Sequence, residues 1–461
     1  MLALLFRWHV RLGYVAGAVL ILWAASGILH PVLSFTQVRP VAFVPPVVPI
    51  DSADAQPLSA LSGLPERVSG LRLLSLQGLS VYQLTMPETK ERRYYRADTG
   101  APLPSAEMAH AEILARHYSG EKNARIAAIH TQTAFSESYP KINTYLPAIK
   151  VIFDRPDTLS VYVSTANDRL GTVNTDTKEL LLAWFQRIHT LSFLKPLGDG
   201  RIVIIALSML VAFSMAGLGI GLLWKLRRPK TPHGLRGLHR RLAWLVFVPI
   251  LLFSSTGLFH LLVTSYAKPT IPVAVPSFTV ALAKALPNLE TGIALLDARL
   301  IQLDEKTRWR VEYTTAGAKH GDIAYYSIDT GERLSLTDAD AAQSLAASLL
   351  PDVEFSGAPS RVLRYNSEYG FANKRLPVWR LEATDGTLVF IDTKDAVIAA
   401  KVGALHKAEL WTFNTLHKGQ FMDKLFGLKP PVRDGVLVAI ASLIIIMSAF
   451  GIVLTRRRQR S

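Results

Sequence analysis

One apolar stretch near the N-terminus constrains this chain more than any other feature. His9 and His30 lie 21 positions apart, and Arg11 is the only charged residue between them. At a rise of 1.5 Å per residue this stretch forms a helix about 31 Å long, which matches the hydrocarbon thickness of a bilayer. Because 21 residues are three heptads, both imidazoles face one side of the helix in a left-handed bundle. The sequence therefore predicts a membrane helix with a histidine at each end.

The same pattern recurs later in the chain. His239 and His260 are again 21 positions apart, each at an offset of 230 from the first pair. A third pair, His189 and His417, has an offset of 228, and each member precedes an Asp-Gly step that opens another apolar segment. Three histidine pairs in register predict that the chain is a tandem duplication.

The segments between the apolar stretches repeat as well. The turn Tyr94–Gly100 matches the turn Tyr325–Gly331 at five of seven positions. Each contains Asp-Thr-Gly, which suits a hairpin because the aspartate can bond nearby backbone and the glycine can adopt a positive φ. We therefore expect each repeat to contain, in order, a membrane span, an outer α+β domain and a second span.

Four segments are apolar and long enough to cross a bilayer, namely 10–33, 201–224, 242–264 and 435–455. The first is predicted to be an uncleaved anchor, because its apolar core is longer than that of a signal peptide. Basic residues flank the spans: Arg7, Arg11, Lys225, Arg227, Arg228, Lys230, Arg236, Arg240, Arg241, Arg456, Arg457, Arg458 and Arg460. By the positive-inside rule, both termini and the link between the second and third spans are cytoplasmic.

This placement accounts for the net charge of +15 without nucleic acid as a partner, because no aromatic-interleaved basic domain remains. The lipid bilayer is the predicted partner instead. We expect a multi-pass protein of a bacterial inner membrane with two periplasmic domains. The predicted parts are a first span (1–33), a first periplasmic domain (34–199), a second span (200–225), a cytoplasmic link (226–241), a third span (242–264), a second periplasmic domain (265–434), and a fourth span with a basic tail (435–461).

Each periplasmic domain is expected to combine short strands with an amphipathic helix. In the first, strands are predicted at 71–76, 81–85, 92–96, 148–153, 159–164 and 171–175, with a helix from an N-cap at Ser105 to about Tyr118. In the second, helices are predicted at 277–285 and 338–350, with strands at 298–303, 308–314, 323–328, 378–383 and 387–391. The fold class is thus a four-helix transmembrane bundle with two α+β domains.

The chain contains no cysteine, and this absence narrows the possible metal chemistry. It excludes disulfides, thiolate sites, iron–sulfur clusters and covalently attached c-type haem. Histidine remains the strongest nitrogen ligand for a transition metal.

With these features in place, the sequence resembles the PepSY-associated transmembrane family. The resemblance covers nearly the whole chain and rests on the motifs Trp8–Gly13, Ser26-Gly27, Thr256-Gly257, Leu416–Gly419, Trp379–Leu381 and Phe390–Thr393. One departure is Leu191, which stands two residues after His189 where the second repeat has a glycine. The resemblance implies PepSY-like outer domains. Because the family includes inner-membrane reductases of ferric siderophores with two b-type haems, it also implies haem b and iron reduction.

The paired histidines fit that expectation. Two facing helices, each with a histidine at both ends, can supply one imidazole to each axial side of an iron at both membrane faces. We expect two haem b groups, with His9 and His239 as axial ligands at the cytoplasmic side and His30 and His260 at the periplasmic side.

The outer pairing has alternatives. His189 and His417 are predicted at the same outer face, where they could replace the outer pair, hold a propionate or bind substrate. The histidines could also be interfacial side chains that extend to the lipid headgroups, or buried core residues. His110 and His117, seven positions apart on a predicted helix, are expected to be solvated.

Three classes of function remain. The first is a haem b electron carrier that reduces a ferric siderophore or another periplasmic ferric chelate. Because no nucleotide-binding motif is present, its electrons would come from quinol or a separate cytoplasmic donor. The second class is a PepSY membrane protein that binds a periplasmic peptide or protease without redox chemistry. A transporter is disfavoured because the spans carry no buried acids or broken helices.

The charge pattern makes one direct prediction. Reporter fusions after Lys230 and Ser461 should report the cytoplasm, and fusions near Gly120 and Gly331 should report the periplasm, because the basic flanks hold the termini and the link inside. Paired alkaline phosphatase and green fluorescent protein fusions measure this. A cytoplasmic signal at either outer position would contradict the tandem arrangement.

Overall fold

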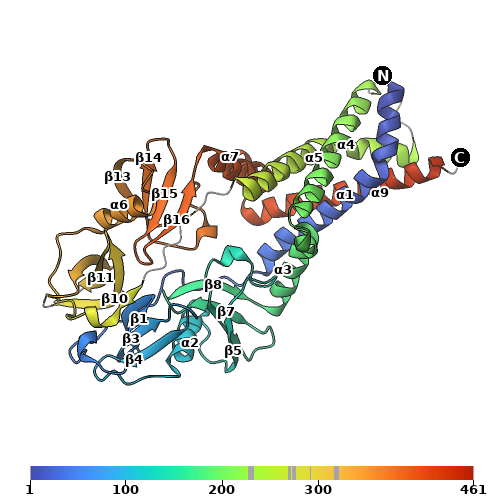
Figure 1. Ribbon diagram of the computed structural model, residues 1–461. Helices are drawn as coiled ribbons and strands as arrows, with labels where there is room; N and C mark the ends of the chain where they lie inside the picture. The colour runs from blue at the N-terminus through green and yellow to red at the C-terminus, as the bar shows by residue number, and fades with distance from the viewer. Residues whose placement is uncertain are drawn as a thin grey trace. The chain divides into compact units, whose positions relative to one another are not determined.

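The computed structural model describes residues 2–226, 233–267, 271, 277–290, 292–315 and 321–459 (Figure 1). The basic residues Arg227, Arg228, Lys230 and Arg460 lie outside the described residues. The chain divides into two compact units, each built from both repeats. The helical unit comprises residues 1–37, 176–268 and 404–461, and the sheet unit comprises residues 38–175 and 269–403.

Four helices of the helical unit are long and apolar enough to cross a membrane: α1 (Leu2–Thr36), α4 (Asp199–Lys225), α5 (Gly234–Tyr266) and α9 (Pro430–Gln459). They confirm the four predicted spans but extend beyond them. The start of α5 at Gly234 takes eight residues from the predicted link 226–241. The helices continue into the basic flanks, which a hydropathy criterion leaves out of a predicted span. They can do so because basic side chains can lie at the membrane surface.

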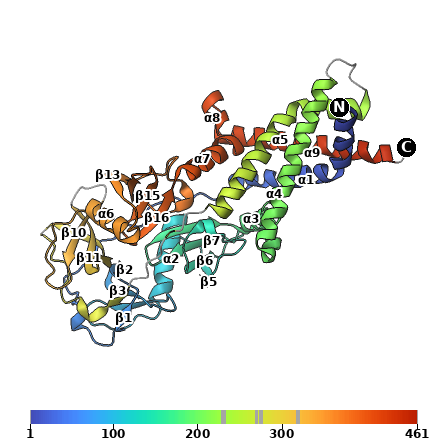
Figure 2. The same cartoon turned by 45° about the horizontal axis from the view of Figure 1, so that its top comes forward.

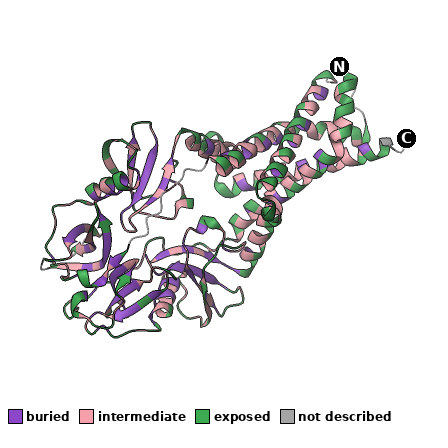
Figure 3. Cartoon of the chain, in the orientation of Figure 1, coloured by how far each residue is buried: buried purple, intermediate pink, exposed green. Residues whose placement is uncertain are grey.

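The spanning helices form a bundle in which α1 packs against α4 and α9, and α5 packs against the same two helices. The duplicated helices α1 and α5 therefore lie diagonally opposite each other. Gly17 brings α1 close to α9, since a Cβ there would lie 2.7 Å from Ile452 Cγ1. Much of the surface of these helices is exposed or half-buried (Figure 3), as lipid-facing helices require.

Each repeat adds a shorter helix to the helical unit, which the sequence analysis did not predict. Helix α3 (Asp176–His189) packs against α1. Helix α7 (Ala404–Thr412) continues into a π-helical turn, η6 (Phe413–His417), and both pack against α5. A short helix, α8 (Phe421–Phe426), leads into α9 (Figure 2). Residues 176–199 thus pack with the spans rather than with the outer domain to which the sequence assigned them.

The sheet unit contains sixteen strands in the described part of the chain. The first repeat contributes β1 (Arg67–Val68), β2 (Gly70–Leu76), β3 (Leu79–Thr85), β4 (Arg92–Arg96), β5 (Ile126–Gln132), β6 (Ala148–Phe153), β7 (Ser160–Ser164) and β8 (Arg169–Asn174). The second contributes β9 (Phe278–Thr279), β10 (Ile293–Leu303), β11 (Lys306–Thr315), β12 (Asp322–Ser327), β13 (Phe355–Val362), β14 (Val378–Ala383), β15 (Leu388–Asp392) and β16 (Val397–Val402).

The two repeats share a six-stranded sheet. Six antiparallel strands run in the order β12-β11-β10-β2-β3-β4, and the pairing of β10 with β2 places Arg299 opposite Arg72 and Ala298 opposite Leu73. The sequence predicted two separate domains, but this seam joins them into one unit. Pairing between strands over 200 residues apart leaves no local signal, so periodicity alone could not reveal it.

Each repeat also has a four-stranded sheet of its own, covered by one helix. Helix α2 (Ala106–Ser119) packs on the sheet β5-β6-β7-β8, and α6 (Asp338–Leu349) packs on β13-β14-β15-β16. The start of α6 is fixed by a capping box between Thr337 and Asp340. Ser105 occupies the predicted N-cap of α2, but its side chain makes no capping hydrogen bond.

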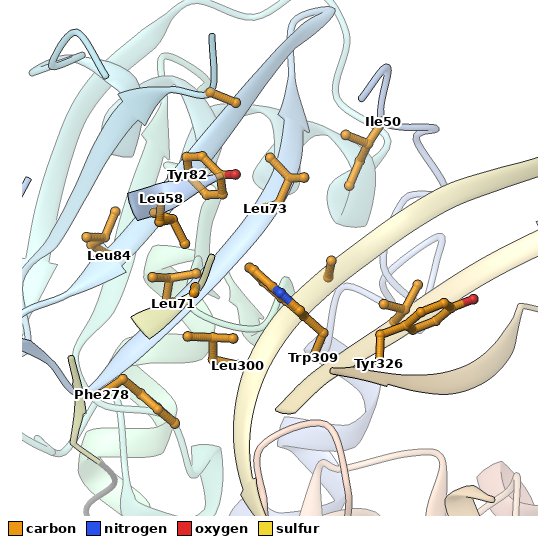
Figure 4. Close-up of a cluster of buried hydrophobic side chains, with 14 of the residues drawn as sticks. Ile50, Leu58, Leu71, Leu73, Tyr82, Leu84, Phe278, Leu300, Trp309 and Tyr326 are labelled. Atoms are coloured by element: carbon orange, nitrogen blue, oxygen red, sulfur yellow. The ribbon is translucent and has the colours of Figure 1, made fainter. Parts of the chain in front are cut away.

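The largest core lies under the shared sheet and combines both repeats (Figure 4). In β2, Leu71 and Leu73 face this core, as the two-residue period of a strand requires. Trp309 of β11 is fully buried beside them and donates its indole N–H to the carbonyl of Ala285, 2.9 Å away. Burial of this large side chain contributes about 2–3 kcal/mol to the stability of the seam.

A network of buried ion pairs lies at the same seam. Arg72 pairs with Asp168 and, at 3.1 Å, with Asp297, while Arg299 pairs with Asp297 at 2.7 Å and Asp395 at 3.5 Å. Burial alone would raise the pKa of Asp297, but Arg299 and Arg72 hold that pKa below its usual range. Removing one member would leave its partner charged and buried, which costs about 3–5 kcal/mol.

Most predicted strands are confirmed within one or two residues, but the helix predicted at 277–285 is wrong. That segment forms strand β9 and a 3₁₀ turn at Val280–Leu282. The local apolar pattern of this segment predicts a helix. Strand β9 instead pairs with β1 of the other repeat, and this distant pairing decides its structure. Strands β1, β5, β13 and β16 were missed.

The hairpin glycines make a stability prediction. Gly331 has φ 72°, and a Cβ there would lie 2.2 Å from the carbonyl oxygen of Leu286. Gly331→Ala should therefore destabilise the protein by more than the roughly 1–2 kcal/mol that a positive φ alone costs. Gly386→Ala is the matched control, since φ is 77° there and no atom lies within 4 Å of its Cβ. Thermal unfolding of the purified variants measures both, and equal losses would contradict the clash.

Candidate functional site

His9 and His239, which the sequence predicted as a pair, face each other inside the helical unit. They lie on the opposed helices α1 and α5, with ring centres 6.3 Å apart and ring planes at 64°. His239 donates from Nδ1 to the carbonyl oxygen of Met447 at 2.9 Å, since a carbonyl can only accept. The Nδ1 of His9 is buried and has no hydrogen-bond partner among the residues that the structure describes.

A cavity opens beside these two imidazoles. It holds about 620 Å³ of space free of protein atoms, its open mouth included. Small residues from all four spanning helices form much of its wall: Gly13, Gly17, Ala216, Gly219, Ala243, Ser448 and Gly451. A Cβ at Gly451 would lie 3.1 Å from His239 Cε1, so glycine leaves room for the ring.

The other end of the bundle holds the remaining four histidines in two matching groups. His189, at the end of α3, is hydrogen-bonded through Nδ1 to Ser26 Oγ at 3.0 Å. His417, at the end of the π-helical turn, is hydrogen-bonded through Nδ1 to Thr256 Oγ1 at 3.0 Å. Ser26 and Thr256 are the polar members of the repeated Ser/Thr-Gly steps. In the structure, the hydroxyl of each step is thus bonded to a histidine of its own repeat.

These hydroxyl groups fix the tautomer of both histidines. Ser26 donates its single hydroxyl proton to the carbonyl of Trp23, 3.1 Å away, and Thr256 donates its own to the carbonyl of Leu252. Each hydroxyl can therefore only accept from the imidazole, so Nδ1 of His189 and of His417 carries the proton. The lone pair is then on Nε2, which is the arrangement of a metal-binding histidine held by an outer hydrogen bond.

Both of these imidazoles are neutral at physiological pH. Burial lowers the pKa of His189 to about 4, and nearby His30 lowers it further. Burial lowers the pKa of His417 to about 3, and His189 adds to the effect. Neutral imidazole is the form that can bind a metal.

His30 and His260, which the sequence favoured as the outer pair, are not in ring contact with each other among the described residues. His30 makes an edge contact with Phe185 (6.2 Å between ring centres), which stacks on His189 at 4.8 Å. His260 stacks on Phe413 at 3.9 Å, and Phe413 stacks on His417 at 4.9 Å. In each repeat an aromatic ring thus separates the two histidines.

The match to a protein family completes this picture. The family described as the PepSY-associated TM region matches residues 6–458. The chain belongs to this family. Comparison with curated proteins finds no match, and neither does comparison with solved structures. The matched part includes the four spanning helices and all six paired histidines.

In this member of the PepSY-associated TM region, sequence reasoning missed three features of the site. Glu409 of α7 is buried and accepts a hydrogen bond from His260 Nδ1. The π-helical turn presents His417, and such turns are frequent at functional sites. Leu191 adopts a left-handed conformation with φ 47°, where Gly419 has φ 67° in the other repeat. The missing glycine therefore did not change the backbone.

His110 and His117 belong to the sheet unit. His110, expected to be solvated, is instead buried in the sheet unit between Tyr94 and Asp168, with both ring nitrogens bonded at 2.9 Å. His117 bonds the carbonyl of Val44. Within the described residues, no group of three or more His, Asp or Glu side chains converges as the ligands of a bare metal ion would. Two histidine side chains suffice to hold a haem iron, and the paired histidines could supply them.

Proposed function

We propose that this chain is a haem b electron carrier of a bacterial inner membrane that reduces a ferric chelate in the periplasm. The observation that carries the proposal is the pair His9 and His239, with ring centres 6.3 Å apart beside a cavity walled by small residues. Metal–nitrogen bonds to histidine are about 2 Å long and the ring centre lies about 1 Å behind the nitrogen, so two axial imidazoles have centres about 6 Å apart. The separation of these two rings therefore suits a shared iron.

For the second haem, the hydrogen bonds support His189 and His417 over His30 and His260. Both have a protonated Nδ1 and an Nε2 that is available for iron. Because His189 is bonded to Ser26, four positions before His30, this pair also lies about 6 Å closer to His9 along α1. A shorter gap favours electron transfer between the two sites.

A haem b held by these imidazoles would supply one-electron chemistry. The chain's own residues hold the imidazoles, exclude water from the apolar cavity and keep the two sites within one bundle. The electron donor is quinol or a cytoplasmic protein. The acceptor is a ferric siderophore or similar chelate, because reduction to Fe(II) weakens the hold of hard oxygen ligands and frees iron from a complex too large to cross the membrane.

Haem content tests the ligands directly. Purified wild-type protein should contain about two low-spin haems b per chain by pyridine haemochrome assay. His9→Ala and His239→Ala should each remove one haem, and His189→Ala and His417→Ala should each remove the other, because each deletes an axial ligand. His130→Ala, in strand β5 of the sheet unit, is the matched control and should retain both.

Two results would contradict these assignments. Colourless protein from haem-replete cells would end the redox proposal and favour a PepSY binding protein. Haem loss in His30→Ala and His260→Ala, with retention in His189→Ala and His417→Ala, would restore the outer pair that the helix spacing first predicted.

The reaction has its own test. Protein reduced under anaerobic conditions is mixed with ferric siderophores and a ferrous trap, and haem absorbance is followed. Reoxidation should match trapped Fe(II) at one iron per electron, and the loss of one haem in His9→Ala should lower the number of electrons released per chain. If the haems stay reduced with every ferric complex but are oxidised by another acceptor, the chain is still an electron carrier, and the proposal of a ferric substrate is wrong.

A further inference from the structure

A second cavity lies wholly within the sheet unit, where three segments of that unit meet. It holds about 450 Å³ of space free of protein atoms, open solvent included. The segment after α1 contributes Phe43, the start of β8 contributes Arg169, and the loop after β13 contributes Tyr365, Phe371 and Lys374. The wall thus combines two cationic side chains with three aromatic rings.

We propose that this cavity binds a ferric chelate of negative charge with an aromatic body, such as a catecholate complex. The identity of the ligand as an iron chelate rests on the proposed function. The charge and aromatic preference rest on the residues of the cavity alone.

Arg169 supplies the first independent observation. The side chain is buried, and one end of its guanidinium group pairs with Asp392 through Nη2 at 2.9 Å. Its Nη1 is also buried and has no hydrogen-bond partner in the described part of the chain. A buried donor without an acceptor is energetically unfavourable. An anionic oxygen of a ligand would supply the missing acceptor.

Lys374 supplies the second cation. Its ammonium group lies 4.0 Å from the ring centre of Phe371 and donates to the carbonyl of Gly171 at 3.0 Å. These contacts hold the charge beside the aromatic wall. Two cations and exposed ring faces suit a ligand that carries negative oxygens on an aromatic body.

The duplication indicates that this lysine is not needed for the fold. Lys374 ends the 3₁₀ turn Phe371–Asn373 with φ 61°, and Thr144 ends the matching turn Lys141–Asn143 with φ 71°. The first repeat therefore ends its turn with a positive φ as well, and it does so without a lysine. Tyr365 adds a neutral hydroxyl group, since burial raises its pKa to about 12.

The test measures binding without electron transfer. Full-length protein in detergent is titrated by calorimetry with the gallium(III) complex of 2,3-dihydroxybenzoate, which is anionic, and with the neutral gallium(III) complex of acetohydroxamate. Gallium(III) is not reduced under these conditions, so binding does not depend on the haem sites. The anionic complex should bind more tightly, and its affinity should fall as salt is added.

Lys374→Gly should weaken binding of the anionic complex about tenfold or more, because a charge-assisted contact is lost. Glycine favours the left-handed backbone at this position, so thermal stability should be unchanged or higher. Lys374→Arg should retain binding. Lys306→Ala, which removes a lysine at the start of β11 outside the cavity, is the matched control and should bind as the wild type does.

Equal affinity for the two gallium complexes, or wild-type affinity in Lys374→Gly, would overturn the inference. The haem assay and the ferrous trap report separately on the proposed function. Protein that lacks haem but binds the anionic complex through Lys374 would keep this site and reject the redox role. Protein that reduces ferric chelates but fails the gallium test would keep the redox role and reject this binding site.

Discussion

The arrangement of the helical unit depends on one constraint: the bilayer requires each spanning segment to satisfy its own backbone hydrogen bonds. Four long helices meet this requirement, and duplication places α1 and α5 diagonally across one bundle. Side chains at equal heights on these two helices therefore face each other. The contact between His9 and His239 is a direct consequence, and the glycines around them leave the space beside the rings.

At the other end, short helices rather than spans supply the best-oriented imidazoles. Helix α3 and the turn after α7 bring His189 and His417 against Ser26 and Thr256. The hydroxyl of each Ser/Thr-Gly step has only one proton, and a helix carbonyl takes it. The imidazole must then donate from Nδ1, so a common helix-packing motif also sets which ring nitrogen can bind a metal.

In the sheet unit, the two repeats of the chain form one unit instead of two separate domains. Pairing of β2 with β10 merges two three-stranded halves into one sheet, and the buried pairs of Arg72 and Arg299 with aspartates join that seam to the flanking sheets. Equivalent positions of the two repeats nevertheless differ. Thr144 and Lys374 both have a positive φ, and the lysine lines a cavity of the sheet unit.

The sequence by itself determined the four spans, the duplication and the six paired histidines, because hydropathy, helical spacing and repeat offsets are local or periodic signals. It also predicted that His9 and His239 meet, since both occupy the same position of the repeated span. Only the tertiary structure decided the β2–β10 seam, the hydrogen bonds that orient His189 and His417, and the burial of Glu409 beside His260. These depend on contacts between residues about 150 to 230 positions apart, and no pattern within either segment records which distant partner it will meet.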